Sequence, residues 1–494
     1  MSKQYRPWSP EQAFLLPPSP MEWLPEGHLA YFLLEVVNEL DLTAIEAVIQ
    51  AKDPRGERPY SPRMMTALLL YAYCTGTFSS RRIERATYED VAMRVIAGGA
   101  HPFWTTINAF RLQHGAALSD LFVQVLRLCQ RSGLKTVGHV ALDGTKVQAN
   151  ASKHKAMSYD RMKKEEQRLI GEIEVLMRRA AEADAREDAE FGSDRRGDEL
   201  PEELQRRESR LQRIREAKAA LEKEAAATRA AELHDNAASL REKTGDPTVP
   251  SRERKAAETL AAKADKQANE IAAHDGDDDD DGPSGGAATD LPSHRVQTTS
   301  DGTPKPKAQR NFTDPESRIM VRNGAFLQAF NAQAAVTEDQ IIVAHGVSND
   351  PTDARQLAPM VERVVANCGA PPSVLTADSG YLSEANVAYS AARGVDAYIA
   401  TPKSDAEKLI AVPDTERMIA RWDMHEKVTS SRGRRIYALR KILVEPVFGQ
   451  VKSAMGFRRF SMRGLMKAAH EWSIVCACHN LLKIFRARRF GPAT

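Results

Sequence analysis

Apolar positions divide the chain into a helical first quarter, a charged middle and a part with strand-like periodicity. From residue 25 to residue 131, apolar residues come in helix-length runs such as His28–Val37 and Met64–Tyr73. Ser61 followed by Pro62 is typical of a helix start, because proline fits the first turn. The pattern predicts an all-helical domain over 25–134, behind a Pro-rich flexible arm over 1–24.

Strand-like runs lie on both sides of the charged middle. The runs 137–142 and 373–377 predict strands that end at Asp143 and Asp378. Other segments complete an α/β pattern. Residues 325–336 and 340–347 predict an antiparallel hairpin, residues 353–365 and 383–393 predict two helices, and residues 397–401 predict a last strand.

We therefore predict a multidomain α + α/β protein with a mixed-sheet domain. Its sheet domain combines residues 135–157 and 311–485, and a basic tail follows over 486–494.

The charged middle, residues 158–310, is rich in Ala, Glu, Lys and Arg. A seven-residue seam of Leu204, Leu211, Ile214 and Leu221 predicts an antiparallel helical hairpin, followed by a third helix from about Ser251. The aspartate run 277–281 is typical of a self-repelling, disordered linker. We expect this segment to be an insertion in the sheet domain.

Composition says little about binding partners, but it indicates the cellular compartment. The 494 residues carry a formal net charge of +2, with acid concentrated mid-chain and base near the C-terminal end. Five scattered cysteines give no disulfide framework, and no apolar run is long enough to span a bilayer. We expect a cytoplasmic protein without a membrane partner.

The chemistry centres on carboxylates. A lone Asp-Gly pair such as Asp143-Gly144 most often marks a turn, but two strand-terminal aspartates in one sheet repel unless a cation neutralises them. A third carboxylate, Glu445, precedes Pro446 in a pattern that suits a helix start, and Lys452 on that helix could reach a phosphate. This set predicts a site for a divalent metal ion.

Basic residues surround the third carboxylate. Their positive charges could neutralise the phosphates of a nucleic-acid backbone, and the aromatic side chains between them could stack on unpaired bases. For Phe448, packing in the core is at least as good an interpretation. The candidate DNA contacts are Arg434, Arg435, Tyr437, Arg440, Lys441, Lys452, Arg458, Arg459 and Arg463, with Arg111 in the helical domain. That domain fits either a helix-turn-helix DNA-binding module or a plain helical bundle with solvated arginines.

Four ordered motifs together resemble the DDE-type transposases of bacterial insertion sequences. They are Val140–Lys146, Asn311–Arg318, Leu375–Tyr381 and Val444–Lys452, with further similarity over Phe457–Gly464 and in the N-terminal helices. The resemblance is to the insertion-sequence 4/5-like group, closest to the insertion-sequence 1182 type.

The resemblance implies an RNase H-like catalytic domain, a DNA-binding N-terminal domain and a metal-binding triad of Asp143, Asp378 and Glu445. Two Mg²⁺ ions, or Mn²⁺ in their place, suit phosphodiester chemistry, with Asp143 bridging both. Tyr437 and Arg440 stand one residue early relative to the signature of related elements, so Lys441 is a candidate for the arginine's place.

The resemblance predicts a transposase that cuts the ends of its element and joins the 3′-hydroxyl to target DNA. It would act on double-stranded DNA as a homodimer, associated with the nucleoid when bound. Two alternatives stay open: a catalytically inactive DNA-binding regulator derived from such an element, and a metal-dependent nuclease that cuts without joining.

Overall fold

The computed structural model describes residues 19–51, 58–191, 202–245, 250–273, 291–322, 324–402 and 416–490. Most of the predicted arm over 1–24, the aspartate run 277–281 and the last four residues of the predicted tail lie outside these ranges. None of the described helices is long and apolar enough to cross a lipid bilayer.

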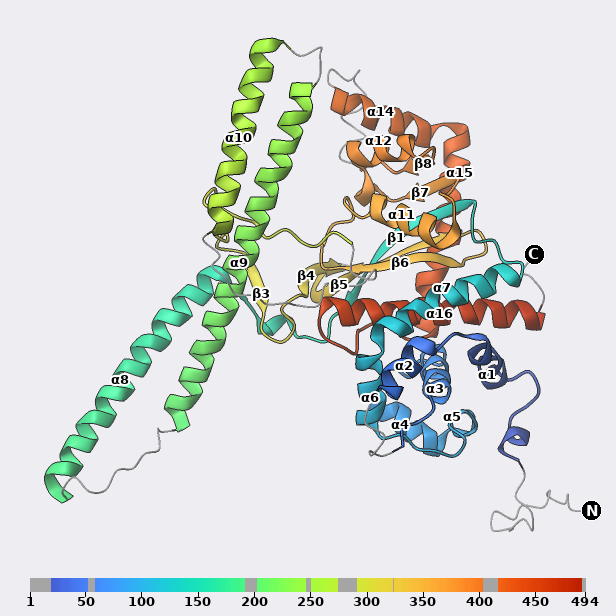
Figure 1. Cartoon of the computed structure of the whole chain (residues 1–494), viewed down its shortest axis with the longest axis horizontal. Coiled ribbons are helices and arrows are strands. Elements are labelled where there is room, and N and C mark those ends of the chain that lie inside the picture. The colour runs from blue at the N-terminus through green and yellow to red at the C-terminus, as the bar shows by residue number, and fades with distance from the viewer. Residues whose placement is uncertain are drawn as a thin grey trace, which may run out of the picture.

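The first part of the chain is helical, as predicted (Figure 1). Its helices are α1 (Leu29–Glu39), α2 (Thr43–Gln50), α3 (Pro62–Cys74), α4 (Ser80–Glu89), α5 (Val91–Ile96), α6 (Trp104–Gln113) and α7 (Gly115–Arg131). Helix α3 begins at Pro62, as the Ser-Pro pair predicts. From Met65 onward every residue of α3 is buried, because α1 packs on one side of it and the C-terminal helix on another.

A mixed sheet forms the centre of the molecule. Its strands are β1 (His139–Gln148), β4 (Arg318–Arg322), β5 (Ala325–Thr337), β6 (Ile342–Ser348), β7 (Val374–Ala377) and β8 (Asp396–Ile399), in the order β4-β5-β1-β7-β8 with β6 also on β5. Strand β5 runs antiparallel to β1, β4 and β6, whereas β1, β7 and β8 are parallel. The predicted hairpin is thus confirmed as β5 and β6.

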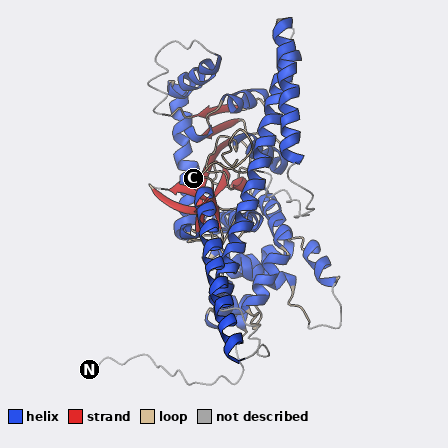
Figure 2. Ribbon diagram, turned by 90° about the vertical axis from the view of Figure 1, so that its left-hand side faces the viewer, coloured by secondary structure: helices blue, strands red, loops and turns tan. Residues whose placement is uncertain are grey.

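Helices surround the strands, as the turned view in Figure 2 shows. They are α11 (Leu357–Cys368), α12 (Glu384–Ala392), α14 (Glu416–Thr429), α15 (Ser431–Gly449) and α16 (Leu465–Phe490). Helix α11 ends at Cys368, and the next residue, Gly369, has a φ of 81°, a left-handed conformation that glycine adopts at no steric cost. It begins later than the predicted 353, at Leu357, because the preceding residues form a polar loop.

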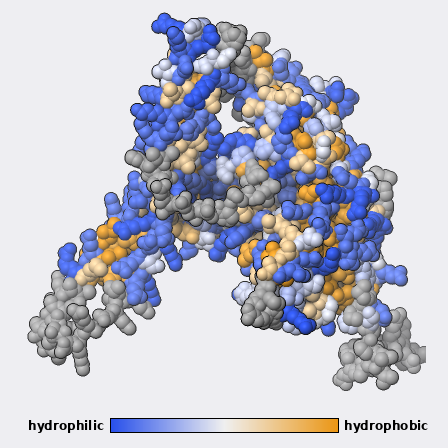
Figure 3. Space-filling view, in the orientation of Figure 1, coloured by the Kyte–Doolittle hydropathy of each residue, from blue (hydrophilic) through white to orange (hydrophobic). Residues whose placement is uncertain are grey.

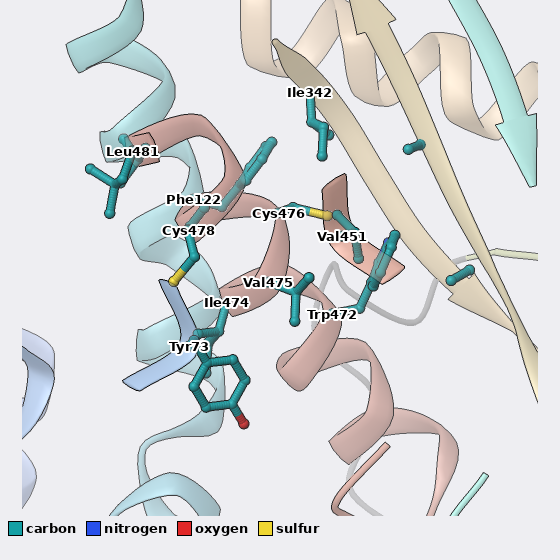
Figure 4. Packing of buried hydrophobic residues seen from close by; sticks show 14 of the residues in the cluster. Tyr73, Phe122, Ile342, Val451, Trp472, Ile474, Val475, Cys476, Cys478 and Leu481 are labelled. Atoms are coloured by element: carbon teal, nitrogen blue, oxygen red, sulfur yellow. The ribbon is translucent and has the colours of Figure 1, made fainter. Parts of the chain in front are cut away.

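Helix α16 joins the helical region to the sheet. It packs against α3 and α7 on one side and β6 on the other, so one apolar core runs through both parts of the chain (Figure 4). Trp472, Cys476 and Cys478 are fully buried in this core. The Cys-Ala-Cys-His sequence of α16 is therefore part of the packing.

The inserted segment forms three long helices, as predicted. They are α8 (Tyr159–Phe191), α9 (Glu202–Gly245) and α10 (Ser251–Ala273), with the short antiparallel pair β2 (Ala156–Ser158) and β3 (Gln309–Asn311) at their base. One half of α9 lies beside α8 and the other half beside α10, so the helices project from the body (Figure 1). The predicted leucine seam is buried, and hydrophilic residues dominate the outer surface in Figure 3.

Candidate active site

Asp143 lies in the middle of β1, so the prediction that it ends a strand is wrong. Strand β5 pairs with β1 from Val140 to Gln148 without interruption, and this pairing keeps the chain extended through Gly144. Glycine is needed here because a Cβ would lie 2.4 Å from Nε2 of Gln333.

Asp378 directly follows β7 and confirms the prediction for that strand. Its Oδ1 accepts a hydrogen bond from the backbone N–H of Gly380 at 2.9 Å, which caps the short 3₁₀ turn Ser379–Tyr381. Since β7 is the parallel neighbour of β1, Asp378 and Asp143 come to the same part of the sheet.

One arginine contacts both aspartates. Nη2 of Arg440, on α15, lies 2.8 Å from Oδ2 of Asp143 and 3.9 Å from Oδ2 of Asp378. The side chains of Arg440 and Asp143 are 12% and 17% exposed, so this ion pair is largely shielded from solvent. The next residue, Lys441, is exposed, and Arg440 is the residue of this pair that contacts the two aspartates.

Burial dominates the electrostatics of the two carboxylates. It raises the pKa of Asp143 from 3.8 to about 6, against the opposing effect of Arg440 and with a further contribution from Asp378. Burial also raises the pKa of Asp378. Asp143 and Asp378 therefore favour either the uptake of a proton or the binding of a cation.

Glu445 lies in mid-helix, and the prediction that it starts a helix is wrong. Helix α15 begins at Ser431, where the Ser430 hydroxyl accepts the backbone N–H of Gly433 at 2.9 Å. Pro446 inside the helix cannot donate to the carbonyl of Ile442, which accepts Nε2 of Gln340 instead.

Glu445 is exposed on this helix. Within the described ranges, no three His, Cys, Asp or Glu side chains form a group that could hold a metal ion. The structure thus joins two of the three predicted carboxylates, and leaves the third on the helix that carries Arg440.

Lys452 lies in the site, on a π-helical turn over Gln450–Ala454 that continues α15. Its Nζ contacts the hydroxyl of Thr145, two residues beyond Asp143 on the same strand. Burial lowers the pKa of Lys452, and Asp143 opposes that effect. Wider turns of this kind often occur at functional sites, because they re-aim a side chain.

Sequence reasoning missed a further carboxylate, Asp353. Its Oδ1 accepts hydrogen bonds from Nδ2 of Asn331 and Nε2 of Gln333, both at 2.7 Å, and lies 3.4 Å from Nζ of Lys146. A Cβ on Gly380 would meet Asp378 Oδ1 at 3.0 Å and Asp353 Oδ2 at 3.4 Å, so both carboxylates flank one glycine. The signal in the sequence is the pair Asp350 and Asp353 after β6, but the predicted helix over 353–365 places Asp353 at a helix start.

The remaining predicted DNA contacts fall into two groups. Tyr437 is half-buried, and burial raises its pKa. The exposed ones are Arg434, Arg435, Lys441, Arg458, Arg459 and Arg463. Phe448, Phe457 and Phe460 are buried, so core packing, and not stacking on bases, is the correct interpretation of these rings.

Arg111 contradicts the prediction of an exposed DNA contact. It is only 3% exposed, and its Nη1 donates to the Tyr73 hydroxyl and to the carbonyl of Phe78, both at 2.9 Å. The periodicity of α6 alone could not show that Tyr73 of α3 and the carbonyl of Phe78 would lie against this arginine.

Two families match the chain. Residues 293–481 match the family described as Transposase DDE domain, and residues 18–113 match the family described as Transposase domain (DUF772). The first match contains Asp378, Glu445 and Lys452, whereas Asp143 stands before the insertion and outside it. No curated protein and no solved structure matches the chain.

Proposed function

We propose that this chain, a DDE-type transposase by its two matched domains, cuts the ends of an insertion sequence and joins the freed 3′-hydroxyl groups to target DNA. The observation that carries the proposal is that Asp143 and Asp378, on neighbouring parallel strands, approach the same nitrogen of Arg440. Two partly buried carboxylates that already share the positive charge of an arginine suit a divalent metal ion. A bound metal ion would attract both carboxylates and offset their mutual repulsion.

The donor set of the site fits Mg²⁺, with Mn²⁺ as an alternative. Asp143 and Asp378 offer hard oxygen ligands, and burial raises the pKa of both, so a metal ion would stabilise their charged forms. Glu445 is the proposed third ligand, by the family resemblance. When bound, two such ions supply activation of the attacking oxygen and stabilisation of the departing one.

The chain's own residues then orient the DNA. Arg440 fixes the directions of Asp143 and Asp378. Lys452, held at Thr145 beside Asp143, brings an ammonium group to the place where the scissile phosphate would lie. Asp353 holds Lys146 on another side of the carboxylates and adds a second lysine to the site.

The finer assignments follow from the same resemblance. We propose an RNase H-like catalytic domain, supported by a sheet in which β1 has one antiparallel neighbour and one parallel neighbour. We also assign the chain to the insertion-sequence 4/5-like group, near the 1182 type, and propose a homodimer that bridges two element ends. The exposed arginines of α15 and of the segment after Lys452 are the proposed DNA contacts.

Cleavage of a labelled duplex that carries the element's own end tests this function. Wild type with Mg²⁺ should cut at the end, whereas Asp143→Asn or a chelator should abolish cutting. Asp396→Asn is the matched control, because Asp396 pairs with Lys427 at the opposite end of the parallel strands and should keep activity. Specific binding without metal-dependent cutting would contradict the proposal and favour the inactive regulator.

A further inference from the structure

The segment after Lys452 returns to the strand that carries Asp143. The backbone N–H of Gln148, the last residue of β1, donates to the carbonyl of Arg458 at 3.3 Å. The N–H of Phe460 donates to the carbonyl of Gln148 at 2.9 Å. We call residues 457–464 the arginine loop, since it carries Arg458, Arg459 and Arg463, all exposed.

Asn150 fixes two arginines of this loop. Nη2 of Arg459 lies 2.6 Å from its Oδ1, and Nε of Arg463 lies 3.2 Å from its backbone carbonyl. Its own Nδ2 donates to the carbonyl of Ser461 at 2.8 Å. The guanidinium groups are therefore preorganised, which reduces the entropy that ordering them on a phosphate backbone would cost.

A buried carboxylate holds the loop from beneath. Glu471, in α16, is fully buried, and its Oε2 accepts the backbone N–H groups of Ser461 and Met462 at 2.8 and 3.4 Å. Its Oε1 accepts the hydroxyls of Ser461 and Tyr73, the latter at 2.8 Å. A buried charge is costly unless it is fully hydrogen-bonded, so these four donors explain why a glutamate is stable here.

The same carboxylate reaches the N-terminal helices. Tyr73 belongs to α3, and its hydroxyl accepts Nη1 of the buried Arg111 of α6 at 2.9 Å. Figure 4 shows the ring of Tyr73 packed beside α16, with its hydroxyl pointing out of the apolar cluster. The Tyr73 hydroxyl thus lies between the Arg111 guanidinium group and the Glu471 carboxylate. This chain of hydrogen bonds joins α3, α6, α16 and the arginine loop.

We propose that Glu471 is a positioning residue for DNA binding: it fixes the arginine loop beside β1 and couples the loop to the N-terminal helices. This inference rests on the proposed function, in which the loop contacts the phosphate backbone. Glu471 is buried beneath the loop, so its effect on the arginines acts through Ser461 and Met462, to which it is hydrogen-bonded.

The test compares variants of the full chain on a labelled duplex carrying the element's end. Glu471→Met keeps the size of the side chain but removes every acceptor, and Glu471→Gln keeps one acceptor oxygen. Ser473→Ala is the matched control, because Ser473 is buried two residues further along α16 and donates to the carbonyl of Ser119, away from the loop. An Arg458/Arg459/Arg463 triple alanine variant measures what the loop itself contributes.

Each phosphate contact contributes about −0.9 to the slope of log affinity against log salt concentration, because binding releases counterions. We expect Glu471→Met to make that slope less negative by roughly two to three, as we also expect for the triple variant, and Glu471→Gln to give a smaller change. Combining Glu471→Met with the triple variant should add nothing. Hydrogen exchange at the amides of Ser461 and Met462 should become faster in Glu471→Met and stay unchanged in the control.

A folded Glu471→Met protein with the wild-type slope and slow amide exchange would overturn the inference. Additive losses in the combined variant would do the same, since they would separate Glu471 from the loop. If Glu471→Met does not fold, the comparison passes to Glu471→Gln and Ser461→Ala, for which wild-type slopes would be equally decisive. A triple variant that binds like wild type would instead refute the DNA contact of the loop, and the inference with it.

Discussion

Asp143→Asn should make the protein more stable while it abolishes cleavage. In the folded protein, burial raises the pKa of Asp143 from 3.8 to about 6 even with Arg440 beside it. At 1.36 kcal/mol for each pH unit, the ionised carboxylate destabilises the fold by about 3 kcal/mol at neutral pH. Asparagine has nearly the same shape and carries no charge, so up to about this amount is recovered in the variant.

The pH dependence gives this prediction its sign. Between about pH 4 and pH 6 the folded state binds more protons at Asp143 than the unfolded state, so wild-type stability falls as the pH rises through that window. Below pH 4 the carboxyl is protonated in both states, and the difference between wild type and variant should vanish.

Thermal unfolding at one scan rate, with chelator present, measures the effect from pH 4 to pH 8. A gain of 1 kcal/mol corresponds to about 2–4 °C in domains of 150–250 residues, so the variant should melt several degrees higher at pH 8. Equal or lower melting temperatures at pH 8, or a gap that persists at pH 4, would refute this account of the carboxylates.

Three other substitutions test the packing around the site. Gly144→Ala should lower cleavage at least tenfold and cost about 1–3 kcal/mol of stability, because its Cβ would meet the Gln333 amide at 2.4 Å; normal activity in the cleavage assay would contradict the close approach. Trp472→Phe removes the hydrogen bond from its Nε1 to the carbonyl of Gln333 at 3.0 Å and should cost about 1–2 kcal/mol in urea unfolding, with unchanged stability as the opposing result. Arg111→Met should cost about 3 kcal/mol or more of folding free energy, because Arg111 is buried at the Tyr73 hydroxyl. The salt dependence of DNA binding by the folded protein should stay unchanged, since Glu471 keeps its hydrogen bonds from Ser461 and Met462; a reduced salt dependence would contradict the buried position of Arg111.

The local elements of this fold were predictable because their signals are local. Apolar periodicity was sufficient for the helices of the N-terminal region, the β5–β6 hairpin and the leucine seam of α9. Asp378 was found because β7 is short and ends where its apolar run ends. Asp143, Asp378 and Lys452 lie close together in the structure, and in the sequence only the order of the motifs grouped them, because periodicity relates only residues near one another in the chain.

Long-range pairing produced the errors. Asp143 lies within a strand because β5, almost two hundred residues later in the chain, pairs across it. Arg111 is buried because Tyr73 of α3 and the carbonyl of Phe78 lie against its guanidinium group. Asp353 belongs to the site because amide side chains of β5 reach it. Arg440 rather than Lys441 meets the aspartates because the register of α15 is set by packing on the sheet.

Strand joining tests the central claim most directly. A labelled element end that already carries a free 3′-hydroxyl is incubated with target plasmid, Mg²⁺ and either wild type, Asp143→Asn, Asp378→Asn or the Asp396→Asn control. We predict joined product with wild type and the control, and none with the two site variants or with chelator. Cutting of DNA ends without any joined product would contradict the transposase account and leave a nuclease.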